Sequence, residues 1–308
     1  MSLKRVGHLA LPPNRGAGGF DHADVHAGSD RLYVAHTSND ALDVVDCTRD
    51  CFIESVPGLP AVAGALVSER RGLVFTSNRG ENTVSILAPG KERDAVKIQV
   101  GVKPNGLAFD PGRGTLIAAN VGDPAIAGSF TVSVVDVERR ERVADIPVPG
   151  RTRWSVYDAA RDMFYVNIAS PPRIVAIPSA EARSLAGEID VPAAGPHGLD
   201  LDLETGQLFC ACDAGVLLAI DPSTGQIQGE AALSGGPDVV FLDRLKKHLY
   251  VAVGNPGVID VIDTIRMRRV QTVETELGSH TFALDRKRRK LYAFLPETHR
   301  AAVFLDQD

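Results

Sequence analysis

Residues 32–46 read LYVAHTSNDALDVVD, and this phrase decides the fold. It joins an apolar strand of LYV type, across a short polar turn, to a second strand that ends in Asp. Strands of the same type begin at Leu32, Leu73, Leu116, Met163, Leu208, Leu249 and Leu291. An internal repeat of about 42 residues, with one supersecondary unit in each copy, is the signature of a repeat architecture.

Each copy carries four expected strands. An apolar strand precedes the LYV strand, the third strand often ends in Asp, as at Asp46 and Asp136, and a more polar strand follows, such as RVADIPV from Arg142. The residues alternate as in strands, and no segment has a helical period. Radial repetition of such sheets protects their edges, so we expect one all-β domain over residues 1–308, a seven-bladed β-propeller of four-stranded antiparallel blades.

The seventh copy is one strand short, because it ends with AVFLDQD at residues 302–308. The segment KRVGHLALP, residues 4–12, has the pattern of a fourth strand and precedes the first copy. We therefore expect this N-terminal strand to complete the last blade and close the ring.

Composition narrows the range of partners. The chain has 308 residues, of which 44% are hydrophobic, and a net charge of −6, which disfavours nucleic acid. No apolar run reaches the roughly 18–20 residues that span a bilayer, so we expect no membrane insertion. The N-terminus lacks the apolar core of a signal peptide, which favours the cytoplasm, or the periplasm or secretion if a signal was removed. A small-molecule ligand and a protein partner both remain open.

The four cysteines form two local pairs. Cys210 and Cys212 lie on one face of a strand, where we expect them to be buried as small apolar residues. Cys47 and Cys51 flank a tight turn and could face each other across a hairpin. A disulfide between them would need an oxidising compartment, so their redox state stays open.

One polar position recurs at the start of the innermost strands, five residues before the Asp that usually ends them. We call it the ring position. Six of its seven residues are polar or ionisable, whereas the residues that follow it are mostly apolar or Gly. Since equivalent positions in a repeat project equally, we expect them at one mouth of the central channel. They are Asp21, Ala63, Asn105, Arg153, His197, Asp238 and His280.

The ring position suggests two kinds of chemistry. Two imidazoles and two carboxylates from consecutive blades suit a divalent metal, with Zn, Mn, Fe, Mg or Ca as candidates. The expected ligands are Asp21, His197, Asp238 and His280. The same histidines and Asp238 also suit general acid–base catalysis, with Arg153 holding an anionic substrate. A channel that is merely hydrated, with water between its polar side chains, is the alternative.

Further candidates for ligand binding lie beside the ring position. Asn105 belongs to it, and His22 follows Asp21 and could point into the site or toward the neighbouring blade. Loops between second and third strands open on the same mouth and carry polar residues such as Asn120 and Asp213. We include Asn120 among the ligand-binding candidates, although Asn and Asp also favour turns for their own conformational reasons.

The units LYVAHTSNDALDVVD and VKPNGLAFDPGRGTLIAAN, residues 32–46 and 102–120, resemble the YVTN/YncE-like β-propeller family, whose repeats read YVTN…VSVID. Its wider relatives include the gluconolactonase-like and virginiamycin-lyase-like propellers. The resemblance covers essentially the whole chain and implies a seven-bladed propeller. It specifies function poorly, because one fold hosts many activities.

The resemblance implies two functional classes. Gluconolactonase-like enzymes hold a divalent metal in the channel, and KPNGLAFDP around Asn105 is similar to their Asn-bearing strand, although the first inner strand here has no Glu. GPHGLDLD around His197 looks like the Gly-Pro-His-Gly repeats of the virginiamycin-lyase-like group. A metal-dependent hydrolase or lyase is therefore one expectation. A non-catalytic YVTN-like scaffold or protein-interaction module is the other, and whether the chain is an enzyme stays open.

Overall fold

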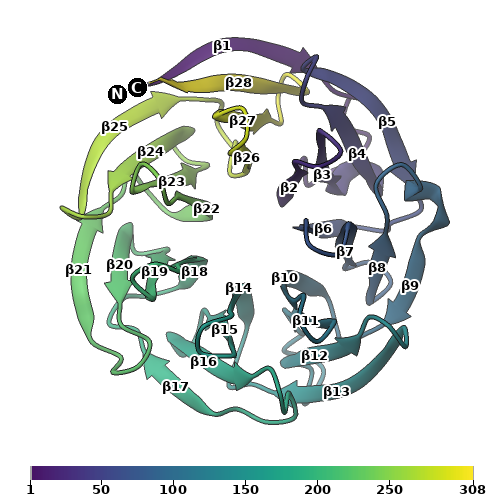
Figure 1. Ribbon diagram of the computed structural model, residues 1–308, viewed down its shortest axis with the longest axis vertical. Coiled ribbons are helices and arrows are strands. Elements are labelled where there is room, and N and C mark those ends of the chain that lie inside the picture. Colours follow the sequence, from purple (N-terminus) through teal and green to yellow (C-terminus); the bar gives the residue numbers. More distant parts are fainter. Residues whose placement is uncertain (1, 308) are drawn as a thin grey trace.

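The computed structural model describes residues 2–307 as a ring of seven four-stranded antiparallel sheets around a central channel (Figure 1). The expected all-β, seven-bladed propeller is confirmed. Within residues 2–307 the helical segments are two single 3-10 turns, η1 (Thr37–Asn39) and η2 (Glu92–Asp94). No helix in that range is long and apolar enough to cross a membrane.

The first four blades each use four consecutive strands, ordered from the channel outward. Their bounds are β2 (Ala23–His26), β3 (Arg31–His36), β4 (Ala41–Asp46) and β5 (Cys51–Pro57) in blade one; β6 (Val62–Ser68), β7 (Leu73–Asn78), β8 (Thr83–Leu87) and β9 (Val96–Gln99) in blade two; β10 (Pro104–Asp110), β11 (Thr115–Asn120), β12 (Thr131–Asp136) and β13 (Glu141–Pro147) in blade three; and β14 (Thr152–Asp158), β15 (Met163–Ile168), β16 (Arg173–Pro178) and β17 (Gly187–Asp190) in blade four.

The next two blades follow the same order, and the last one combines both ends of the chain. Their bounds are β18 (Pro196–Asp202), β19 (Gln207–Cys212), β20 (Val216–Ile220) and β21 (Ile227–Ala232) in blade five; β22 (Pro237–Asp243), β23 (His248–Val253), β24 (Val258–Asp263) and β25 (Arg268–Glu274) in blade six; and β26 (Phe282–Asp285), β27 (Lys290–Leu295), β28 (Arg300–Gln307) and β1 (Ser2–Ala10) in blade seven.

The closure of the ring by the N-terminal strand is confirmed. β1 pairs antiparallel with β28, from Ser2 opposite Gln307 to Ala10 opposite Arg300, and the two strands lie side by side at the outer rim (Figure 1). The expected bounds, residues 4–12, were two residues late. Pro12 and Pro13 have no backbone N–H to donate to a ladder, so the strand ends before them.

Within residues 2–307, hydrophobic side chains form seven clusters, each filled from two neighbouring blades, rather than one central core. Tyr292 and Phe294 of blade seven, for example, pack with Leu32 and Val34 of blade one, together with Leu9 of β1. The middle strands are therefore buried on both faces, which explains why the LYV segments read as continuous apolar runs. The innermost strand of each blade therefore lines the central channel.

All four cysteines are free thiols. Cys51 lies opposite Asp46 in the β4–β5 ladder, and Cys47 is fully buried in the cluster between blades seven and one. Burial raises the pKa of the Cys47 thiol to about 12, so the thiolate needed for exchange is disfavoured there. Cys210 and Cys212 are buried on β19, as expected.

Candidate site at the channel mouth

The ring residues lie at one mouth of the channel. In blades two to six the ring residue is the second residue of the innermost strand, and in blades one and seven it lies two residues before that strand. Backbone hydrogen bonds join the position across neighbouring blades: His22 N donates to Ala63 O at 3.0 Å, and Val239 N donates to His280 O at 3.4 Å. The repeat thus brings these seven backbone positions to equivalent places.

Glycine next to the ring position lets the blades approach closely. A Cβ added at Gly106 would lie 2.4 Å from the carbonyl oxygen of Arg153, and one at Gly198 would lie 2.4 Å from that of Asp238. Real Cβ atoms do not come so close to backbone, and two packed blades cannot move apart cheaply. Close packing at the mouth therefore depends on these residues lacking a side chain.

A matched pair of substitutions tests this close approach. Gly106→Ala should lower the free energy of unfolding by about 1–3 kcal/mol, because the methyl group forces blades three and four apart. Gly187→Ala on β17 is the control, since a Cβ there has nothing within 4 Å, and it should be neutral or slightly stabilising. Urea unfolding measures both, and equal effects would contradict the close approach.

His197 is the centre of a charged cluster at the mouth. Its Nδ1 lies 2.8 Å from Asp213 Oδ1, and its Nε2 lies 3.2 Å from Asp238 Oδ1. Arg153 brings Nη1 to 3.1 Å from the same Nε2 and Nη2 to 3.6 Å from Asp213 Oδ2. Only 14% of the His197 side chain is exposed. The cluster is assembled from blades four, five and six.

The two carboxylates determine the charge of His197. Burial opposes the charged ring, but the charge of Asp238 and hydrogen bonds to Asp213 and Asp238 outweigh it and raise the His197 pKa to about 9. For Asp238, burial is likewise outweighed, by the His197 charge, and its pKa falls below its usual range. The pKa of Asp213 is also lowered, by its hydrogen bond to His197. At neutral pH the cluster is therefore an imidazolium between two carboxylates.

This charge state leaves Arg153 with unused donors. Nε2 of His197 can accept from Arg153 only when it carries no proton, and it can donate to Asp238 only when it does. With a pKa of about 9 the protonated form prevails at neutral pH, so Arg153 Nη1 loses that acceptor. Arg153 Nε is also buried without a partner within residues 2–307, and burial lowers the pKa of the guanidinium.

Asp21 and His22 occupy the blade-one side of the mouth. Arg79, from the turn after β7, forms an ion pair with Asp21. His22 Nε2 lies 3.3 Å from Asp21 Oδ1, and the imidazole packs 4.2 Å from the ring of Trp154. His22 is thus directed into the channel rather than toward the next blade, and burial lowers its pKa, which keeps the ring neutral.

Two other ring residues, His280 and Asn105, form fewer side-chain interactions. His280 donates from Nδ1 to Gly278 O at 2.8 Å, and its charge when protonated acts on Asp238. Asn105 accepts a hydrogen bond from Ser77 Oγ at its backbone carbonyl, whereas its side-chain Oδ1 is buried without a partner within residues 2–307. Asn105 therefore offers one acceptor that the protein itself does not use.

Asn120 has a structural role, and its assignment as a ligand-binding residue stays a prediction, since its Oδ1 is buried without a partner within residues 2–307. It is fully buried at the end of β11, where Nδ2 donates to Thr131 Oγ1 at 2.8 Å and to Ser133 Oγ at 2.9 Å. Asn78 makes the same pair of bonds in blade two, to Thr83 and Ser85. This strand-ending Asn holds the second and third strands of a blade together.

The predicted metal ligands do not fit a divalent ion as they are arranged. Within residues 2–307, no group of three or more His, Cys, Asp or Glu side chains could hold a metal. Both ring nitrogens of His197 face carboxylates, and Asp21 is paired with Arg79. A guanidinium 3.1 Å from Nε2 also opposes a cation there. Metal binding at the mouth therefore stays a prediction from the sequence.

Comparisons with known proteins support the fold alone. No protein-family model and no curated protein matches the sequence. Among solved structures, a chain of Kuenenia stuttgartiensis hydrazine synthase superposes with a TM-score of 0.81 over 94% of this chain and 96% of that one, at 15% sequence identity. At that identity the likeness shows a shared propeller architecture. It assigns neither a ligand nor a reaction.

Proposed function

We propose that the protein is a propeller that binds a small polar anion, such as a carboxylate, at the His197 mouth. The observation that carries the proposal is Arg153. Its side chain is 17% exposed, its Nε has no partner within residues 2–307, and protonation of His197 removes the acceptor of its Nη1. A buried guanidinium with unused donors favours an acceptor with negative charge.

The neighbouring groups support a ligand that is polar as well as anionic. Asn105 has a free Oδ1 that can accept from a hydroxyl or amino group, and the imidazolium of His197 adds positive charge beside Arg153. Asp213 and Asp238 balance that charge, so the mouth selects by hydrogen-bond geometry rather than by net charge. These groups favour a small carboxylate that also bears a donor.

The same cluster argues for binding rather than acid–base catalysis. A general base works best when its pKa lies near the operating pH. His197, at about 9, is protonated and held between two carboxylates at neutral pH, so it acts as a cation. We therefore place His197 and Arg153 in binding roles, and Asp213 and Asp238 in positioning roles.

Isothermal titration calorimetry with malonate tests the proposal. Malonate should bind the wild-type protein and glycerol should not. Arg153→Gln should weaken malonate binding at least about tenfold, the size of one charge-assisted hydrogen bond. Affinity should also fall as the pH rises through 9, because neutral His197 becomes an acceptor for Arg153.

Arg266→Gln is the matched control, since Arg266 is exposed and pairs with Asp263 of its own turn. It should leave malonate binding unchanged. If malonate and phosphate both fail to bind, or if Arg153→Gln binds malonate as well as the wild type, the mouth is no anion site. The propeller would then be a scaffold or protein-interaction module.

A further inference from the structure

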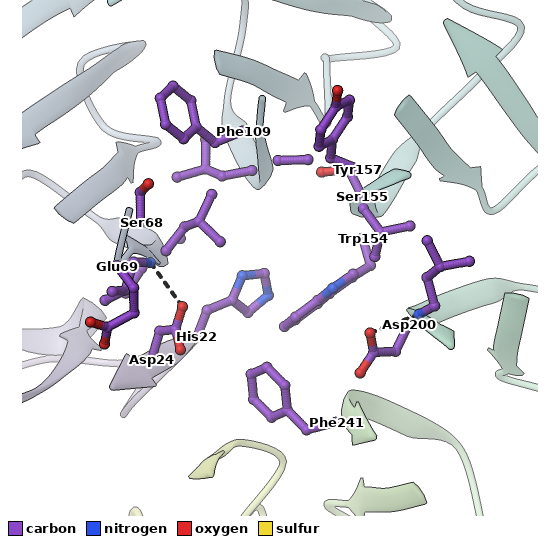
Figure 2. Close-up of a pocket in the computed structure, with 18 of the residues that line it drawn as sticks. His22, Asp24, Ser68, Glu69, Phe109, Trp154, Ser155, Tyr157, Asp200 and Phe241 are labelled. Atoms are coloured by element: carbon purple, nitrogen blue, oxygen red, sulfur yellow. Dashed lines mark hydrogen bonds between the residues drawn. The ribbon is translucent and has the colours of Figure 1, made fainter. Parts of the chain in front are cut away.

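A separate cavity of about 430 Å³ occupies the other half of the channel (Figure 2). Its lining begins one residue after the ring position and continues to the turns at the opposite face, and no ring residue contributes to it. His22 and Trp154, whose rings lie 4.2 Å apart, each follow a ring residue in the sequence and line this cavity. The volume falls within the roughly 300–1,000 Å³ of small-molecule sites.

The walls of this cavity are mainly aromatic and aliphatic. Trp154 meets Phe241 edge-on with ring centroids 6.2 Å apart, and Phe109, Tyr157 and Leu107 complete the apolar surface. Figure 2 shows the rings of Trp154 and Phe241 beside each other, with the carboxylates of Asp24 and Asp200 on opposite sides of the cavity. We call it the Asp24–Asp200 cavity.

The carboxylates of Asp24 and Asp200 accept hydrogen bonds from neighbouring blades, but this structural role does not by itself explain why they are present. Asp24 accepts from Val25 N and Val67 N at 2.8 Å each, and Asp200 accepts from Leu201 N and Leu242 N at 2.7 Å each. Both residues occupy the third place after the ring position. The other five blades hold apolar residues at that place, so the fold does not need a carboxylate there. Those residues are Leu66, Ala108, Val156, Phe241 and Ala283.

The buried hydroxyl of Ser155, unpartnered among residues 2–307, is a second observation that points to a ligand in this cavity. Ser155 lines the cavity on β14, is 3% exposed, and its Oγ has no hydrogen-bond partner within residues 2–307. A buried hydroxyl without a partner is unfavourable by about 1–3 kcal/mol, which a polar group in the cavity would offset. The cavity therefore combines a hydroxyl and two carboxylates with aromatic walls.

We propose that the Asp24–Asp200 cavity binds an organic cation, a protonated amine carried on an apolar or aromatic body. The ammonium group is attracted by the two carboxylates and by the faces of Trp154 and Phe241, and it can donate to Ser155. The apolar body packs against Leu107 and Phe109. The proposal is independent of anion binding at the His197 mouth.

The positive groups that line the cavity, Arg70, Arg244 and Arg286, are exposed at its outer opening. Arg286 is exposed and donates to Leu242 O at 3.0 Å, and Arg244 is exposed with Nη2 3.4 Å from Leu201 O. An organic anion could use these arginines only by keeping its charge at the opening, away from the enclosed carboxylates. The enclosed part of the cavity therefore favours a cation.

Binding of a cation should depend on pH through Asp24 and Asp200, because burial raises the pKa of both carboxyl groups. Burial raises the Asp24 pKa to about 6, against hydrogen bonds from Val67 and Val25 and the charge of Arg286, while Glu69 acts in the same direction as burial. Nearby His22 is kept neutral by burial. Because a cation needs the ionised carboxylate, its affinity should be lower at pH 5 than at pH 7.5, and binding at pH 5 should release protons.

Calorimetry with three probes that share a phenylethyl body tests the proposal at pH 7.5. 2-Phenylethylammonium should bind the wild-type protein, 2-phenylethanol should bind at least about tenfold more weakly, and 3-phenylpropanoate should not bind. Asp200→Asn should weaken the ammonium probe by about tenfold or more. Val156→Phe fills the cavity while keeping every charge, and should abolish binding even if Asp200→Asn fails to fold.

Val143→Phe is the matched control, because Val143 is exposed on β13, and it should retain binding. Arg153→Gln should also retain it, which separates this cavity from the His197 mouth. Equal affinity for the alcohol and the ammonium would overturn the proposal, and so would unchanged binding in Val156→Phe. Binding of 3-phenylpropanoate that is lost in Arg286→Gln would show an anion site at the opening instead.

Discussion

Deletion of residues 1–12 should abolish cooperative folding. The deletion removes β1, and with it the buried side chains of Leu3, Leu9 and Leu11. Each fully buried Leu contributes roughly 1.5–3 kcal/mol, so together they approach the whole stability of about 5–15 kcal/mol expected for a domain. The backbone of β28 would also become an open edge that can pair with other chains. We expect an insoluble protein, or one with no cooperative thermal transition.

A circular permutant provides the control. Joining Gln307 to Ser2 through a short Gly/Ser linker and opening the chain at Gly128, in the exposed turn before β12, keeps every strand. Because β1 and β28 are already paired, the permutant should fold cooperatively. A protein of residues 13–308 that melts like the wild type would contradict closure by β1.

The free energy of unfolding should depend on pH through the protonation of His197. The folded pKa of about 9 lies above the usual 6.5, so the stabilisation is complete below pH 6.5 and is lost as the pH rises to about 9. The shift corresponds to at most roughly 3–4 kcal/mol. Urea unfolding between pH 6.5 and 9 should therefore show a falling free energy of unfolding, and His197→Gln should flatten that dependence.

His8→Gln is the matched control, since His8 is exposed on β1. It should follow the wild type at every pH. The interval stops at pH 9 because the unfolded chain ionises its thiols near that value, whereas burial keeps the Cys47 and Cys210 thiols protonated in the folded protein. A wild-type protein and a His197→Gln variant with the same dependence on pH would show that the cluster does not stabilise the imidazolium.

The fold could be predicted from the sequence because each copy of the repeat packs against its two neighbours in the same way. Each LYV strand, such as the one from Leu32, supplies residues to the clusters on both sides of its blade. The missing fourth strand of the last copy predicted the closure, and only the two prolines at positions 12 and 13 shifted its bounds. The repeat also accounts for the ring position, since an equivalent backbone hydrogen bond joins His22 to Ala63 and Val239 to His280.

Side-chain partners could not be predicted in the same way. Arg79 and Asp213 reach the mouth from turns whose lengths differ between blades, so repeat spacing did not reveal their ion pairs with Asp21 and His197. The structural role of Asn120 was not predicted although a signal existed, because Asn78 holds the same strand-ending place. Asp200 was missed because its significance depends on the five apolar residues at the same place in other blades.

The most direct test of anion binding at the His197 mouth is an NMR titration of the histidine ring nitrogens, with and without malonate. We predict that His197 titrates near pH 9, that malonate shifts its ring resonances, and that malonate raises its pKa further by adding negative charge beside Arg153. A His197 ring that titrates near 6.5 and does not respond to malonate would contradict the account.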